Sequence, residues 1–183
     1  MATTKGSILK SLLKFVEKDL TSSQKEQALA ALTEEERAIA TARLLPSTHV
    51  PESLLNHLTD AAAAVKGEDL DTFGIRAGKA ELADAVGLYR FLFIVLTPSA
   101  LLKKASSTWS SVHDTGTMTV ENQAPNSARI CLRNFPSERA HCARLTGWFV
   151  GLSEMAGAKD VRIDHAVCLT RGGTECAWDL GWT

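Results

Sequence analysis

The sequence predicts an α+β fold in which a helical N-terminal half precedes a β-β-α-β-β unit with an antiparallel sheet. Two observations support this prediction. Apolar side chains recur at helical spacing through the first half, whereas after a turn signal at 113–116 the segments alternate and become richer in Thr, Val and Ile. The 183 residues, 45% hydrophobic and 22% charged, have a globular composition. We therefore expect a single domain, 1–183, with a helical part at 1–112 and an α+β part at 113–183.

Helix-starting and helix-ending residues mark the elements of the first half. Thr33 and Glu36 form the Thr-x-x-Glu capping box that starts a helix, and Pro46 ends that helix. Pro51 suits the first turn of the next helix, which Gly67 closes. Further helices are expected at 70–86, at the nearly all-apolar stretch 88–96, and at 100–112.

The second half is predicted to contain two hairpins around one long helix. Its alternating segments are bounded by Gly, Asn and Asp, which is typical of strands joined by tight turns. The long amphipathic segment between the hairpins is followed by Gly157, a common helix-ending residue. The expected elements are strands at 118–121 and 128–133, a helix at 137–156, and strands at 161–170 and 174–182.

Three of the four cysteines and one histidine follow the pattern Cys-x22-His-x2-Cys-x7-Cys, at Cys142, His165, Cys168 and Cys176. Thiolates and imidazole are the ligands that tetrahedral Zn2+ prefers, and a site with four protein ligands is structural rather than catalytic. In the alternative interpretation the cysteines are small core hydrophobes and His165 lies at the surface or is hydrogen-bonded. Both interpretations stay open, because only the fold can bring the four residues together.

The turn of the last hairpin decides between these interpretations. With a three-residue turn at 171–173, Cys168 faces Cys176 and the two can share a metal ion. A four-residue turn instead pairs Val167 with Trp178 and directs the two cysteines to opposite faces. Because His165 and Cys168 point to opposite sides of a regular strand, a metal site also requires a β-bulge.

Aromatic side chains form a second candidate site. Trp109, Trp148, Phe91 and Phe93 could line a ligand pocket between the helical half and the sheet, where apolar small-molecule sites are typically found. Ordinary core packing is the alternative, and aromatic residues at helical spacing serve that purpose more often.

Composition and the absence of certain motifs exclude several classes of function. A net charge of −1 gives no general electrostatic footprint for nucleic acid, and Arg133, Arg139 and Arg144 are interpreted as solvated surface. No run approaches the roughly 20 apolar residues of a membrane span, and the start of the chain has no signal-peptide pattern. We expect a cytoplasmic protein with reduced thiols. We expect no enzyme, because no nucleophile-base pair or open metal position is apparent.

The C-terminal run CARLTGWFVGLSEMAGAKDVRIDHAVCLTRGGTECAWDLGW resembles the four-vinyl-reductase domain of phenol-sensing bacterial activators, which is related to the TRAPP-subunit fold. The resemblance covers about residues 115–183. In zinc-bearing members the ligands run Cys, acid, Cys, Cys. The resemblance therefore implies Cys142, His165, Cys168 and Cys176 as ligands, with a histidine in place of the acid.

The N-terminal half resembles the heme-NO-binding-like group, in particular a bacterial branch of short single-domain proteins. The residues that carry this resemblance are KGSIL at 5–9, the helical stretch around Gly74 and Gly78, and FLFIVLTPSALLKKASSTW at 91–109. The resemblance implies the fold of that group.

Heme itself is not expected. Heme-binding members of the group carry a Tyr-x-Ser-x-Arg motif that holds the heme propionates, and residues 132–135, in about that region, lack it. Neither His57 nor His113 lies in the expected helix at 88–96, so a proximal histidine is hard to place.

Three functions are compatible with the sequence, and we expect the first of them. The first is a non-enzymatic sensory module that binds a small apolar ligand in a pocket and whose hairpin a zinc ion stiffens. The second is a scaffold that binds a signalling protein or a second copy of the chain without any ligand. The third is a heme-based gas sensor. A sizeable pocket favours the first function, and a filled core with an apolar surface patch favours the second.

Overall fold

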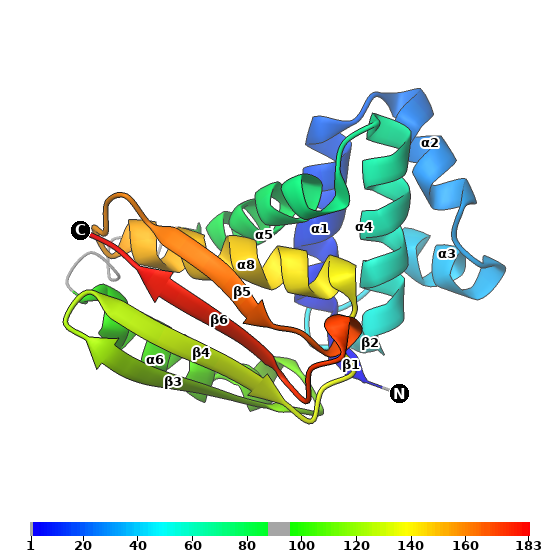
Figure 1. Ribbon diagram of the computed structural model, residues 1–183. Coiled ribbons are helices and arrows are strands. Elements are labelled where there is room, and N and C mark those ends of the chain that lie inside the picture. The colour runs from blue at the N-terminus through cyan, green and yellow to red at the C-terminus, as the bar shows by residue number, and fades with distance from the viewer. Residues whose placement is uncertain (1, 88–95) are drawn as a thin grey trace.

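The computed structural model describes residues 2–87 and 96–183, and it confirms the predicted α+β class (Figure 1). The N-terminal half of the chain is mostly helical, and the C-terminal half contains a four-stranded sheet with helices on one face. The elements are β1 (Thr3–Lys5), α1 (Gly6–Asp19), α2 (Ser22–Ala30), α3 (Glu34–Thr41), β2 (His49–Pro51), α4 (Glu52–Lys66), α5 (Leu70–Val86), α6 (Pro98–Ser107), α7 (Trp109–Val112), β3 (Thr117–Ala124), β4 (Ser127–Arg133), α8 (Arg139–Met155), β5 (Arg162–Val167), the 3-10 turn η2 (Leu169–Arg171) and β6 (Cys176–Gly181).

The main sheet is antiparallel, with strand order β3-β4-β6-β5, and α6 and α8 cover one of its faces (Figure 1). The two predicted hairpins are therefore confirmed, and they join through β4 and β6. Strands β1 and β2 form a separate two-stranded sheet, which the sequence did not reveal because three-residue strands are too short to show an alternating pattern.

Several predicted helix boundaries agree with the structure, but α3 ends at Thr41, before the predicted end at Pro46. Helix α5 spans the predicted 70–86, and Thr33 and Glu36 form both hydrogen bonds of the capping box at the start of α3. The helix predicted over 100–112 is instead interrupted at Thr108, whose side chain donates to the carbonyl of Ala105 and separates α6 from α7. The helix expected at 88–96 lies almost wholly outside the described residues.

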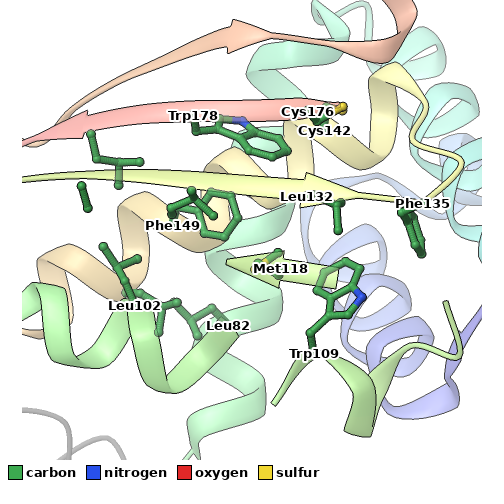
Figure 2. Close-up of a cluster of buried hydrophobic side chains, with 14 of the residues drawn as sticks. Leu82, Leu102, Trp109, Met118, Leu132, Phe135, Cys142, Phe149, Cys176 and Trp178 are labelled. Atoms are coloured by element: carbon green, nitrogen blue, oxygen red, sulfur yellow. The ribbon is translucent and has the colours of Figure 1, made fainter. Parts of the chain in front are cut away.

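The hydrophobic core lies between the sheet and helices α5, α6 and α8 (Figure 2). Trp178 on β6 is fully buried and packs edge to face against Phe149 of α8, with ring centroids 5.2 Å apart. A second cluster lies among helices α1 to α5, and its fully buried members include Leu9, Leu12, Leu54, Leu55, Leu58 and Phe73. Among the described residues, no helix is both long and apolar enough to cross a membrane.

Helices α5 and α8 cross at very short range, and this contact joins the helical half to the sheet. Gly78 on α5 lies against the backbone of Arg144, and Gly147 on α8 lies against the backbone of Ile75. A Cβ atom at either glycine would overlap a carbonyl oxygen of the facing helix. The two glycines therefore fix how closely the two halves approach each other.

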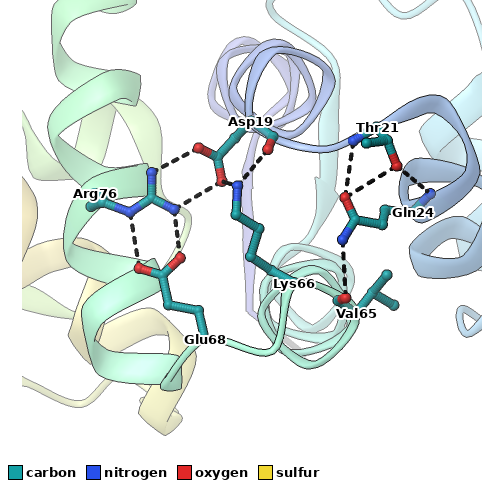
Figure 3. A network of polar contacts seen from close by, with 7 residues as sticks. All are labelled: Asp19, Thr21, Gln24, Val65, Lys66, Glu68 and Arg76. Atoms are coloured by element: carbon teal, nitrogen blue, oxygen red, sulfur yellow. Dashed lines mark hydrogen bonds and ion pairs between the residues drawn. The ribbon is translucent and has the colours of Figure 1, made fainter.

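A polar network fastens the helical half at the end away from the sheet (Figure 3). Arg76 donates to both carboxylate oxygens of Asp19 at 2.8 Å and to Glu68 at 2.6 and 3.0 Å. Lys66 donates to the Asp19 carboxylate and to its main-chain carbonyl. Because Asp19 and Lys66 lie at the ends of α1 and α4 and Arg76 lies on α5, the network holds these three helices together.

Candidate functional site

The structure brings the four predicted metal ligands together. Cys142 comes from α8, His165 from β5, Cys168 from the residue before η2, and Cys176 from the start of β6. Their candidate ligand atoms all lie within 4.8 Å of one another. The three cysteines are buried free thiols. Whether a metal ion binds there stays a prediction, but the geometry needed for one is present.

The hairpin register explains how these ligands meet. Val167 pairs with Ala177, which is the register of the three-residue turn, and the alternative pairing of Val167 with Trp178 does not occur. The pairing then shifts between Asp164 and Val167. This irregularity is the bulge that the spacing of His165 and Cys168 requires, and it places both side chains beside Cys176.

The close contact between two of the cysteines changes the pKa of each thiol. The Sγ atoms of Cys142 and Cys176 lie 3.7 Å apart. This hydrogen bond raises the pKa of the Cys142 thiol, with burial adding to the increase, and the same bond lowers the pKa of Cys176. The contact therefore favours a thiolate at Cys176 over one at Cys142. The Nε2 atom of His165 is buried without a hydrogen-bond partner, so its position suits a metal ligand.

A second candidate site is a cavity of about 110 Å3 between the helical half and α8. Trp109 and Trp148 line it, whereas Phe91 and Phe93 lie outside the described residues. Two histidines that the sequence did not single out as pocket residues also line it, His113 and His141. The His113 ring stacks on Trp109 with centroids 3.9 Å apart.

His141 is the less usual of the two histidines. Its side chain is stacked on Phe135 with centroids 4.6 Å apart, and the residue is only 2% exposed. Neither ring nitrogen has a hydrogen-bond partner. Burial, and then the charge of Arg144, hold the pKa of His141 well below its usual range. The imidazole is therefore neutral and has a free lone pair inside the cavity.

A buried charged cluster also lines the cavity. Arg144, only 3% exposed, donates to Glu52 at 2.6 Å and to Glu81 at 3.4 Å, and the Trp148 ring nitrogen donates to Glu81 at 3.0 Å. Burial raises the pKa of Glu52 to about 7, although the charge of Arg144 opposes the increase. The interpretation of Arg144 as solvated surface is therefore wrong. Its position on the apolar face of the predicted helix was the signal that could have revealed it.

The spacing of the propionate-binding motif also occurs here, at 135–139, slightly later in the sequence than the region 132–135 where it was expected. Phe135, Ser137 and Arg139 follow the Tyr-x-Ser-x-Arg spacing, with Phe in place of Tyr. Arg139 is exposed and pairs with Asp69 and Asp71 at the surface. The Ser137 hydroxyl is buried without a hydrogen-bond partner. Phe135 has no phenolic hydroxyl, and its ring stacks on His141.

Comparison with known proteins supports the fold strongly. No family model matches the sequence, and no curated protein matches it. Several solved structures do match, over nearly the whole chain. An unliganded Fe(II) H-NOX protein from K. algicida has a TM-score of 0.73 at 15% identity, covering 98% of this chain and 96% of that one. An H-NOX protein from S. oneidensis in the Fe(II)NO state has a TM-score of 0.74 at 15% identity, with coverage of 98% and 99%. An oxygen-binding H-NOX domain related to soluble guanylate cyclases has a TM-score of 0.72 at 9% identity, with coverage of 98% and 95%.

These matches confirm the resemblance to the heme-NO-binding-like fold and give no support to the four-vinyl-reductase resemblance. They also contradict the expectation that heme is absent. The solved proteins of this fold are described in Fe(II), Fe(II)NO and oxygen-bound states, and a further one in terms of heme redox potential and porphyrin distortion. The missing tyrosine was therefore insufficient ground for excluding heme.

Proposed function

We propose that this chain is a heme-based sensor domain, which binds heme in the cavity beside α8 and responds to a diatomic gas. The observation that carries the proposal is His141, a buried neutral histidine with both ring nitrogens free, on the wall of an apolar cavity. Histidine is the usual proximal ligand of heme iron in gas-binding proteins. The fold match to proteins described in gas-bound states adds support.

The donor set of the cavity fits heme. His141 and His113 offer the iron a neutral imidazole, because burial lowers the pKa of both side chains. Trp109, Trp148 and Phe149 supply apolar walls that exclude water. Bound heme would supply the iron that takes the gas. The residues of this chain would hold that iron, orient it, and keep the site dry.

The size of the cavity sets a condition on the proposal. Sites for ligands of drug size usually enclose about 300–1,000 Å3, whereas this cavity encloses about 110 Å3. Heme binding must therefore displace side chains that now fill the space. Trp109 and Trp148 are the largest of these, so their fluorescence is expected to change when heme enters.

The test is a hemin titration of the purified chain, followed by its Soret band. His141→Ala is expected to weaken or shift the band. His57→Ala is the matched control, because His57 is half-exposed, pairs with Glu36, and does not line the cavity. His113→Ala tests the second histidine of the same wall. Absence of a Soret band, or an unchanged band in both His141→Ala and His113→Ala, would overturn the proposal.

We also propose that Cys142, His165, Cys168 and Cys176 hold a structural zinc ion. The support is the set of four ligand atoms within 4.8 Å, with the donor chemistry of three thiols and one imidazole. Because protein side chains fill all four positions, the ion would stabilise the fold and catalyse nothing. Elemental analysis of the untagged protein tests this, and about one zinc per chain is the expected result.

The scaffold function has less support. A ligand-free interaction module needs an exposed apolar patch. Among the described residues, Leu45 is the large hydrophobic side chain that stands exposed, at 69%, and a single residue does not make a patch.

A further inference from the structure

We propose that metal occupancy of the cysteine-histidine cluster controls the ligand cavity through the first turns of α8, so that the two sites are energetically coupled. This inference rests on the proposed function for the identity of the cavity ligand. The coupling itself rests on how one helix is shared between the two sites.

The two sites meet at consecutive residues. His141 lies on the wall of the cavity and contacts Trp109 and Phe135. Cys142, the next residue, lies against Cys176 at the start of β6, and Figure 2 shows this pair. A helix turns by about 100° per residue, so neighbouring positions face different partners. A metal ion that holds Cys142 in place would therefore also restrain His141 on the same turn.

A second connection runs through Trp178. The ring of His165 lies parallel to the Trp178 ring with centroids 4.4 Å apart. The Trp178 ring nitrogen donates to the Thr146 hydroxyl on α8 at 2.9 Å, and the ring packs against Phe149, which also lines the cavity. A change in the position of His165 is therefore passed to α8 by packing, independently of Cys142.

The first turn of α8 is well suited to respond. Its N-cap residue, Glu138, forms no side-chain capping hydrogen bond, so the helix start lacks the usual local restraint. Cys142 is the metal-ligand candidate on this turn. A bound ion that joins Cys142 to β5 and β6 would order the turn. A cavity ligand held by His141 would then bind at a smaller cost in conformational entropy.

The coupling has a measurable size and direction. Allosteric couplings are typically about 5- to 150-fold in affinity, and they are reciprocal. We expect hemin to bind at least about 5-fold more tightly to the zinc-loaded chain than to the chelator-stripped chain. Zinc should bind more tightly to the hemin-loaded chain by the same factor.

The experiment titrates hemin into the full chain in both metal states and measures amide hydrogen exchange of heme-free protein with and without zinc. The expected result is tighter hemin binding with zinc, together with slower exchange in α7, at 109–112, which has no metal ligand of its own. Cys131→Ser is the matched control, because Cys131 is a buried cysteine on β4 outside the cluster.

The outcomes separate the two proposals. Equal hemin affinity in the two metal states overturns the coupling. Absence of hemin binding in both states overturns the proposed function instead, and the exchange data then decide the coupling alone. In that case, slower exchange in α7 with zinc supports it, and an effect confined to 162–176 overturns it.

Discussion

The Sγ atoms of Cys142 and Cys176 lie 3.7 Å apart where α8 meets β6. Two thiolates on one tetrahedral zinc ion, with Zn–S bonds of about 2.3 Å, would be about 3.8 Å apart. This pair is therefore already placed for a shared metal ion, although the two residues are separated by a helix, a strand and a turn.

Replacing one ligand should release the metal and destabilise the fold. Cys176→Ser is expected to lose bound zinc and to show a large fall in melting temperature, because binding energy of a structural ion is also folding energy. Elemental analysis and thermal unfolding measure the two effects. Cys131→Ser should keep its zinc, and unchanged metal content and stability in Cys176→Ser would contradict the metal site.

Gly78→Ala tests the close crossing of α5 and α8. On an isolated helix this change would stabilise by about 1 kcal/mol, because alanine is the better helix former. Here the added Cβ would overlap the carbonyl oxygen of Arg144, so the free energy of unfolding should fall by about 3 kcal/mol. Urea unfolding measures the difference. Ala83→Gly, at an exposed position of the same helix, should cost only about 1 kcal/mol, and a stabilised Gly78→Ala would show that the helices do not touch there.

The buried Glu52 carboxyl should make stability depend on pH. Its pKa of about 7 lies above its ordinary value of 4.5, so the folded state keeps a proton that the unfolded state releases. Glu52 therefore adds roughly 3 kcal/mol to the free energy of unfolding below about pH 4.5, and this contribution is lost as the pH rises through about 7. Burial lowers the pKa of His113 to about 3, so the contribution of His113 has the opposite sign and is lost as the pH falls from 6.5.

Glu52→Gln separates these two contributions. The variant should show a smaller decline in stability between pH 5 and pH 8, with a remainder from Glu81, whose pKa burial also raises, and it should keep the decline on the acid side. Urea unfolding at intervals of one pH unit measures both, with the exposed Glu26→Gln as the control for the loss of a carboxylate. A variant that declines toward pH 8 as steeply as the parent chain would show that Glu52 is ionised throughout.

Asp19→Asn tests the network that joins α1, α4 and α5. Hydrogen bonds from Arg76 lower the pKa of Asp19 to about 2, so its contribution is present above about pH 3.8 and is lost as the pH falls through about 2. We expect a cost of about 1–2 kcal/mol at neutral pH, since the partners are partly exposed. Chemical unfolding at pH 7 checks this. Glu17→Gln, which removes an exposed ion pair with Lys25, should lower the free energy of unfolding by less than about 0.5 kcal/mol. Equal costs for the two substitutions would show that the Asp19 network stabilises the fold no more than a surface ion pair.

Local patterns in the sequence predicted most of the fold. Capping residues such as Thr33 and alternating segments such as 128–133 are decided within a few neighbours, so they can be read without the rest of the chain. The spacing of Cys142, His165, Cys168 and Cys176 likewise identified the candidate ligands. The same spacing left the register of the last hairpin open, because both turns satisfy the local chemistry.

Tertiary structure alone decided the cavity and its charges. Helical periodicity shows that one face of α8 is buried, but it does not say that Arg144 on that face meets Glu52 and Glu81, which are 92 and 63 residues away. Nor does it show that His141 would be left without a hydrogen-bond partner. The sequence by itself predicted most of the elements and the candidate metal ligands, because helix caps, periodicity and residue spacing can be read directly from the chain. The fold determined which buried polar groups are paired and which are free, because those partners come from segments distant in the chain.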